Sequence, residues 1–163
     1  DEYRQRFPQG SLRHEVSFTR VELLADLGRS REALNESEAL LGSASGQERA
    51  SELHMLRGKV FRRDLGDPAS AAREYAKAEQ LGGALAAEAT RLQGLSLEAA
   101  GDLRGALEAY RRYLARGDGS RQAEVTRLIE ALTARARSSA GEVGAGAVGA
   151  GSPGGTTGRE PTP

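Results

Sequence analysis

The amino-acid sequence predicts an all-α fold in which helical hairpins stack one after another, and three observations lead to this prediction. Apolar residues recur with a period near 3.6 along most of the chain, as in amphipathic helices. Turn glycines stand at Gly28, Gly66 and Gly101, at intervals of 38 (28 to 66) and 35 (66 to 101) residues. Alanines follow five residues after each of them, at Ala33, Ala71 and Ala106. Self-similarity at this spacing is typical of helical-repeat proteins.

Local start and stop signals place the helices in order. Glycine suits the left-handed residue that ends a helix, and Ser or Asp suits an N-cap that accepts free backbone N–H groups. The clearest stop and restart is Gly66-Asp67-Pro68, because proline favours the first helical position. We therefore expect helices over about residues 12–27, 31–41, 48–65, 69–81, 84–99, 103–116 and 121–137. The expected N-caps are Ser11, Ser30, Asp67, Asp102 and Ser120.

The remaining segments have a different character. Residues 1–7 have the pattern of the final turns of an earlier helix, which Pro8 stops because proline cannot continue a helix. The Gly/Ser-rich residues 42–47 are expected to form a loop. Residues 138–163 are rich in Gly, Ala, Ser and Pro, with too little apolar bulk to offset the entropy of ordering. We therefore expect a disordered tail there.

Side-chain sizes repeat as well. Four residues after the repeated alanines stand Ser37, Tyr75 and Tyr110. A small residue is needed where the two helices of a hairpin cross closely, and a larger one fills the space beside it. Because the connecting turns are short, the paired helices must be antiparallel. The alanines are therefore expected to be buried against an adjoining helix.

These residues resemble the tetratricopeptide repeat (TPR). The third unit carries the resemblance through Gly94, Leu97, Gly101, Ala106 and Tyr110, in that order and spacing. The second unit carries it through Gly58, Phe61, Gly66, Ala71, Tyr75 and Ala78, with one extra residue near positions 64–65. The first unit keeps Gly28, Ala33 and Leu40 but has Val21 where a small residue is usual and Ser37 where an aromatic is usual.

The resemblance covers about residues 1–137 and implies a right-handed superhelix of α-hairpins. It implies the end of a preceding repeat over residues 1–10 and a TPR-like domain over residues 11–137, with about three hairpins and a C-terminal capping helix. The capping helix would carry Arg127, Glu130, Arg135 and Arg137 on its outer side. Another α-hairpin solenoid remains the alternative fold.

The composition excludes several classes of function. The 23 Lys and Arg residues balance the 23 Asp and Glu residues, so no overall charge points to nucleic acid or to an anionic membrane. There is no Cys, which excludes disulfides and thiolate chemistry. The chain has no run of about 18 apolar residues, so we expect no membrane insertion.

Catalytic and cofactor motifs are missing too. His14 and His54 are the only histidines, and they lack the spacing of a metal-binding HExxH motif. A ligand or general-base role for either is the minor alternative, because His54 stands where a repeat usually places a core aromatic. No serine lies in a GxSxG strand–turn–helix context, and no glycine-rich phosphate loop is present. We therefore expect a protein without enzyme activity, metal or cofactor.

The resemblance also implies where a partner binds. In a TPR superhelix the first helix of each hairpin lines a concave groove in which protein segments dock. The residues at those positions are Glu15, Phe18, Glu22, Asp26, Met55, Lys59, Arg62, Arg63, Glu88, Arg91, Leu95 and Glu98. Their charges give the groove an acidic end and a basic middle, which suits an acidic or mixed-charge segment. The alternative is that they are simply the solvated faces of amphipathic helices.

The expected function is therefore a non-catalytic scaffold or adaptor that binds protein through its concave face. The alternative is a regulatory segment of a larger signalling or envelope-assembly protein that acts on a module in the same chain. The phrase YRQRFPQG resembles the close of a repeat in Gram-negative envelope TPR proteins, which favours the bacterial envelope (periplasm) over the cytoplasm. The uncapped N-terminal edge is a candidate surface for self-association.

Overall fold

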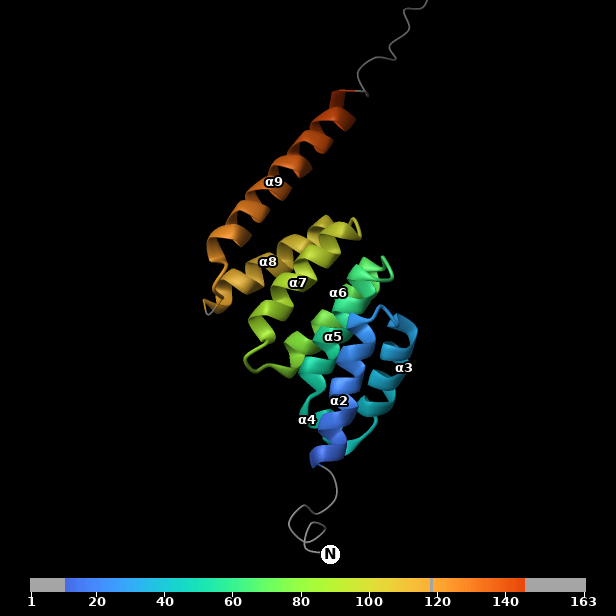
Figure 1. Ribbon diagram of the computed structural model, residues 1–163. Coiled ribbons are helices and arrows are strands. Elements are labelled where there is room, and N and C mark those ends of the chain that lie inside the picture. Colours follow the sequence, from blue (N-terminus) through green and yellow to red (C-terminus); the bar gives the residue numbers. More distant parts are fainter. Residues whose placement is uncertain (1–10, 118, 146–163) are drawn as a thin grey trace, which may run out of the picture.

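The fold is all-helical over the part of the chain that the computed structural model describes, which is residues 11–117 and 119–145. Eight helices and no strand occur in these residues (Figure 1). The helices are α2 (Ser11–Asp26), α3 (Ser30–Leu41), α4 (Ala44–Glu48), α5 (Ala50–Arg63), α6 (Pro68–Leu81), α7 (Ala86–Ala99), α8 (Leu103–Arg116) and α9 (Gln122–Ala145). The all-α prediction is confirmed there, and the expected helix end at residues 1–7 lies outside the described residues.

Each helix packs mainly on the helices next to it in the chain. The pairs α2 and α3, α5 and α6, and α7 and α8 are joined by short connections and form hairpins. Successive hairpins contact one another through α3 and α5 and through α6 and α7, and α9 packs on α8. Figure 1 shows this order as a series of neighbouring helices from α2 to α9. Sequential packing of this kind buries one face of a hairpin against the next.

Two of the predicted N-caps are formed as expected. The Asp67 side chain accepts a hydrogen bond from the backbone N–H of Ser70 at 2.9 Å, at the start of α6. Asp102 accepts from the backbone N–H of Gly105 at 2.9 Å, at the start of α8. Gly101, immediately before this cap, has φ +85°, a conformation that side chains with a Cβ rarely adopt. Each cap satisfies a backbone donor that the helix itself leaves unpaired.

Replacing Asp102 with alanine is expected to lower the free energy of unfolding by about 1 kcal/mol, because the N–H of Gly105 loses its acceptor. Urea denaturation followed by circular dichroism measures this change. The control is Asp102→Asn, which keeps an acceptor at the same place and should fall within a few tenths of a kcal/mol of the parent. Equal losses in both variants would contradict the capping role.

Other helix starts differ from the prediction. Ser30 is the first residue of α3 rather than its N-cap, and its hydroxyl donates to Asp64 of the next repeat at 3.3 Å. α9 begins at Gln122, two residues beyond the predicted cap Ser120. The segment predicted as a loop contains the short helix α4, because Ser43 accepts the backbone N–H of Gly46 at 3.1 Å and so caps a helical turn. Such local bonds are not visible in an apolar pattern.

The last helix is longer than predicted. We expected it to end near Arg137 and to give way to a disordered tail, but α9 continues to Ala145. The first residues of that segment are rich in Ala and Ser and carry Glu142, and no proline occurs before Pro153. Without a proline or a pair of glycines, nothing stops the helix at residue 138. Residues 146–163 lie outside the described part of the chain.

The repeated tyrosines pack against glycines on the facing helix. A Cβ on Gly58 would lie 2.6 Å from the ring of Tyr75, and a Cβ on Gly94 would lie 2.4 Å from the ring of Tyr110. Both distances are shorter than any real Cβ contact, so these rings require glycine on the facing helix. The repeated alanines are also buried, and the fully or almost fully buried members of the set are Ala33, Ala71, Tyr75, Ala78, Ala106 and Tyr110.

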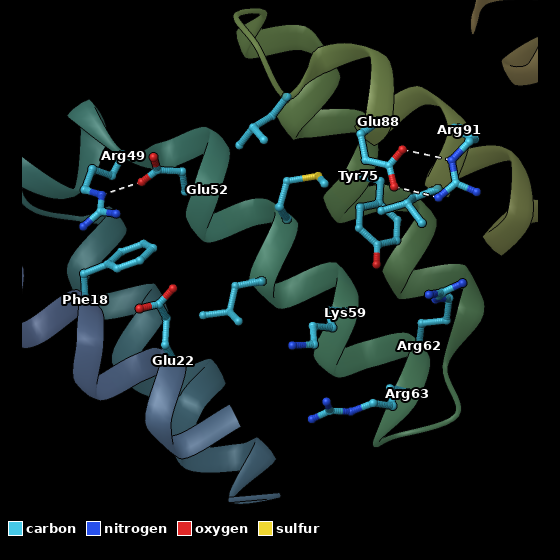
Figure 2. A pocket seen from close by; sticks show the side chains of 14 residues that line it. Phe18, Glu22, Arg49, Glu52, Lys59, Arg62, Arg63, Tyr75, Glu88 and Arg91 are labelled. Atoms are coloured by element: carbon cyan, nitrogen blue, oxygen red, sulfur yellow. Dashed lines mark hydrogen bonds and ion pairs between the residues drawn. The ribbon is translucent and has the colours of Figure 1, made fainter. Parts of the chain in front are cut away.

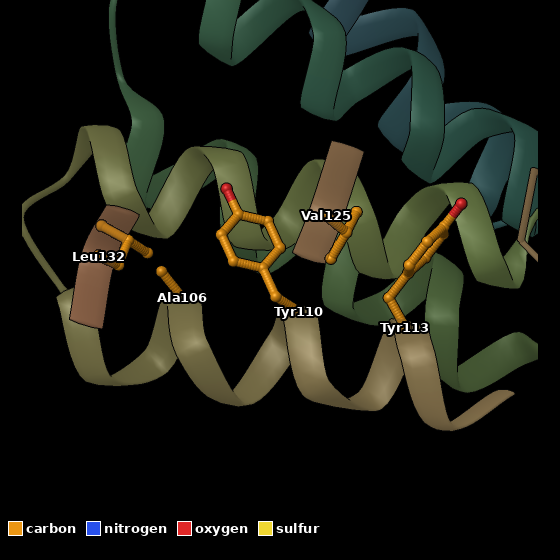
Figure 3. Packing of buried hydrophobic residues seen from close by; sticks show 5 residues of the cluster. All are labelled: Ala106, Tyr110, Tyr113, Val125 and Leu132. Atoms are coloured by element: carbon orange, nitrogen blue, oxygen red, sulfur yellow. The ribbon is translucent and has the colours of Figure 1, made fainter. Parts of the chain in front are cut away.

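Tyr110 belongs to an apolar cluster formed by α8 and α9, shown in Figure 3. Val125 and Leu132 of α9 belong to the same cluster as Ala106, Tyr110 and Tyr113 of α8. All five side chains are buried. α9 thus packs on α8 of the last hairpin, and Arg127, Glu130, Arg135 and Arg137 are exposed on it.

Several large apolar residues in or next to the helices are exposed. Val16 of α2 is 65% exposed, and Leu27, just after α2, is 64% exposed. Leu65 and Leu81, near the ends of α5 and α6, are 43% and 54% exposed. α2 packs on α3 and α5 through the side of the helix that carries the buried Val21. A period of 3.6 allows a wide apolar stripe, and packing covers only part of it.

Candidate binding groove

An open groove of about 650 Å³ lies where α2, α5 and α7 come together (Figure 2). α5 forms its middle, α2 one side and α7 the other. The helical period brings Met55, Lys59 and Arg62 to one side of α5, since they are spaced four and three residues apart. The lining residues are Phe18, Glu22, Arg49, Glu52, Met55, Leu56, Lys59, Arg62, Arg63, Tyr75, Leu85, Glu88, Arg91 and Leu92.

Most of the groove residues predicted from the sequence meet here. Those that line the groove are Phe18, Glu22, Met55, Lys59, Arg62, Arg63, Glu88 and Arg91. Glu15 and Asp26 lie at its edge and join it through ion pairs with lining cations, Glu15 with Arg49 at 3.2 Å and Asp26 with Lys59 at 3.5 Å. The first helices of three hairpins therefore contribute to one surface.

Leu95 and Glu98 were also predicted to face the groove, and the structure places them elsewhere. Leu95 packs on the apolar cluster between α8 and α9. Glu98 accepts a hydrogen bond from the hydroxyl of Tyr110 at 3.2 Å and pairs with Arg135 of α9 at 3.6 Å. The physical reason is that α9 covers this end of α7, so the groove does not continue along it.

Phe18 forms a buried part of the groove wall. Its side chain is only 5% exposed, and the Arg49 guanidinium lies 3.5 Å from the centre of its ring. This distance is well within the range of a cation–π contact. Arg49 also pairs with Glu15 and Glu52, so it is held over the ring from two sides. A partner therefore meets the Arg49 guanidinium rather than the ring of Phe18.

The lining cations differ in whether the protein neutralises them. Arg49, Lys59, Arg63 and Arg91 each pair with a carboxylate, and Arg63 also donates to the backbone carbonyl of Ala25 at 2.9 Å. Arg62 is exposed and forms no ion pair with any of the residues that the structure describes. Its charge is therefore the one in this groove that a partner can neutralise without breaking an existing pair.

Arg91 has a structural role in addition to lining the groove. Its side chain is 8% exposed and pairs with Glu88 of the same helix at 2.6 Å and with Glu124 of α9 at 3.2 Å. The hydrogen bond from Arg91 outweighs burial and lowers the pKa of Glu88 below its ordinary value. Arg91 thus links α7 to the capping helix and is less free than Arg62 to bind a ligand.

The one histidine with a described side chain takes part in a polar network away from the groove. His54 Nδ1 lies 2.8 Å from Glu74 Oε2, and Arg57 Nε donates to the same oxygen at 2.9 Å. Lys77 donates to the other oxygen at 2.9 Å, and Arg57 also reaches Ser37 of the first hairpin at 2.9 Å. The network connects two hairpins. His54 stands at the position where a TPR usually has a core aromatic, but here its ring takes part in a polar network. The side chain of His14 lies outside the described residues.

Several residues that line the groove were not predicted from the sequence, among them Arg49, Glu52 and Tyr75. Tyr75 was assigned to packing alone, but the absence of a Cβ at Gly58 lets its ring cross α5, and the hydroxyl reaches the groove. The glycine–tyrosine pattern was the available signal for this. For Arg49 the signal was its distance of 34 residues from Glu15, close to one repeat.

No group of three His, Asp or Glu side chains that could hold a metal ion occurs among the described residues. No helix in the same part of the chain is both long and apolar enough to cross a membrane. Compared with protein-family models and with curated proteins, the chain matches none.

Proposed function

We propose that this protein is a non-catalytic interaction scaffold that binds a segment of another protein in the groove between α2, α5 and α7. The observation that carries the proposal is the row of cations along α5, Lys59, Arg62 and Arg63, exposed at the middle of an open groove. The groove is open, and its walls carry charges of both signs.

We also propose a TPR-like superhelix as the fold that creates this groove. Ion pairs between successive repeats support it, because they join residues 33 or 34 positions apart, close to the 34-residue period of TPR proteins. These pairs are Glu15 with Arg49, Asp26 with Lys59, Glu79 with Arg112 and Arg91 with Glu124. The repeated glycine–tyrosine contacts, Gly58 with Tyr75 and Gly94 with Tyr110, support it as well.

The charges of the groove favour an acidic or mixed-charge partner. α5 supplies the cations at its middle, while Glu22 and Glu52 lie toward α2. A segment with carboxylates facing α5 and a basic residue near α2 would match both parts. Electrostatic complementarity of this kind contributes mainly to specificity and to the rate of association.

Reversing two groove charges, Arg62→Glu and Arg63→Glu, is expected to reduce recovery of native partners roughly ten-fold in affinity capture, a loss of about 1.4 kcal/mol. The physical reason is repulsion of the partner's carboxylates by the new ones. The control changes the same amount of charge outside the groove, through Arg104→Glu and Arg111→Glu on the exposed side of α8. Unchanged recovery of native partners with the groove variant would contradict the proposal. An equal loss of recovery with the α8 variant would contradict it as well.

A further inference from the structure

The second and third repeats place a tyrosine hydroxyl beside different residues. In each repeat a glycine faces the tyrosine ring, Gly58 for Tyr75 and Gly94 for Tyr110. Four residues after each glycine, one helical turn further on, stands the residue beside the hydroxyl. That residue is Arg62 in the second repeat and Glu98 in the third. The two repeats are therefore matched sites with opposite charge.

In the third repeat the site is complete within the chain. The hydroxyl of Tyr110 donates to Oε2 of Glu98 at 3.2 Å, and Oε1 of Glu98 lies 3.6 Å from the guanidinium of Arg135. One carboxylate thus lies between a phenol and a guanidinium and neutralises the latter. In this repeat, the group held by a phenol and a guanidinium together is therefore a carboxylate.

In the second repeat the phenol and the guanidinium are present together. Tyr75 lines the groove, and Figure 2 shows its hydroxyl pointing into the hollow beside Arg62. Burial raises the pKa of Tyr75 even though Arg62 opposes the rise, so the hydroxyl keeps its proton and can donate it. Arg62 has only donors. Within the described part of the chain, no carboxylate is paired with Arg62 or hydrogen-bonded to the Tyr75 hydroxyl.

We propose that Arg62 and Tyr75 form a subsite for one carboxylate of the bound segment, which accepts from the hydroxyl through one oxygen and from the guanidinium through the other. This inference rests on the groove being a binding site, as proposed above, and it names the group that the site recognises. The carboxylate is either an Asp or Glu side chain or the free C-terminus of the segment.

The surroundings favour a single negative charge over other ligands. Cations are repelled by Arg62, whose charge is not neutralised by any carboxylate of the described residues. A dianion such as phosphate is disfavoured by Glu88, which lies close enough to raise the pKa of Tyr75 and is held in place by Arg91. A neutral amide would leave Arg62 without a counter-charge. A carboxylate meets all three conditions.

The probes are fluorescent nine-residue peptides with one central Glu, the same peptides with Gln in its place, and both versions with a free or an amidated C-terminus. Fluorescence anisotropy gives their affinities. We expect the matching carboxylate peptide to bind, and Arg62→Gln or Tyr75→Phe to weaken it roughly ten-fold, as loss of a hydrogen bond to a charged group does. The double variant should lose less than the product of the two, because both donors hold one carboxylate.

Tyr110→Phe is the matched control, since its hydroxyl is already bonded to Glu98 inside the protein, and the affinity should not change. Tyr75→Phe keeps the ring over Gly58, and Arg62→Gln changes an exposed side chain, so two independent variants report on the site. Loss of affinity on Glu→Gln assigns a side-chain carboxylate, and loss on amidation assigns the C-terminus.

If neither carboxylate matters, or if Tyr110→Phe weakens binding as much as Tyr75→Phe, the subsite is wrong. In that case the groove proposal is judged separately, by the capture experiment with reversed Arg62 and Arg63.

Discussion

Replacing Gly94 with valine is expected to lower the free energy of unfolding by about 3 kcal/mol or more. A Cβ at this position would lie 2.4 Å from the ring of Tyr110, and valine adds two further methyl groups. Tyr110 is fully buried within the cluster between α8 and α9, so its ring cannot move aside without displacing the capping helix. Overpacking of a dense core costs roughly 1–3 kcal/mol and sometimes more. Urea denaturation followed by circular dichroism gives the value.

The control is Ala99→Val, an exposed substitution in the last turn of the same helix, which should cost only a few tenths of a kcal/mol to about 0.7 kcal/mol through helix propensity. The first hairpin suggests a compensating change. It has Val21 at the glycine position and Ser37 at the tyrosine position, and both are buried.

Combining Gly94→Val with Tyr110→Ser should therefore cost less than the sum of the two single changes, because the smaller side chain makes room for the valine. Additive losses would contradict the steric argument.

Replacing Glu74 with alanine is expected to destabilise the protein by about 3–5 kcal/mol. Glu74 is 5% exposed and is the common partner of His54, Arg57 and Lys77. Its removal leaves the Arg57 guanidinium, also mostly buried, without its main counter-charge, although Glu38 pairs with it at 3.0 Å. Removing one partner of a buried ion pair is costly for this reason. The control is Glu32→Ala, a change at an exposed pair with Arg29, which should cost less than about 1 kcal/mol.

Acid should have the same effect as this substitution. Burial alone would raise the pKa of Glu74, but hydrogen bonds from His54 and Lys77 and the charge of Arg57 outweigh it and lower the pKa from 4.5 to about 2. Because the folded pKa is depressed, the stabilisation is fully present above pH 4.5 and is lost as the pH falls toward 2. The expected loss in this window is about 3 kcal/mol.

Other carboxylates with lowered pKa values, Asp64, Asp67 and Glu88, titrate in the same range. The contribution of Glu74 is therefore measured as the difference between parent and Glu74→Ala in urea denaturation between pH 6 and pH 2. This difference should shrink as the pH falls below 4.5. A difference that stays constant over the whole range would rule out Glu74 as the source.

The sequence by itself indicated most of the helices and the turns that join them into hairpins. Gly66, Asp67 and Pro68 define a helix end and a helix start through local backbone chemistry, so their effect does not depend on the rest of the fold. The spacing of Gly94 and Tyr110 specifies which residues meet inside a hairpin, because a short turn allows only one antiparallel alignment. Eight of the twelve residues that the TPR resemblance placed in a groove line the groove between α2, α5 and α7.

Only the tertiary structure decided how neighbouring hairpins meet. Leu95 and Glu98 have the helical position of groove residues, yet α9 covers them. Arg57 crosses from α5 to Ser37 of the first hairpin, and this link depends on a long side chain reaching another repeat. Helical periodicity gives the direction in which a side chain points from the helix axis. Which residues that side chain then contacts depends on the position of the next hairpin, and the packing of all its contacts together sets this position.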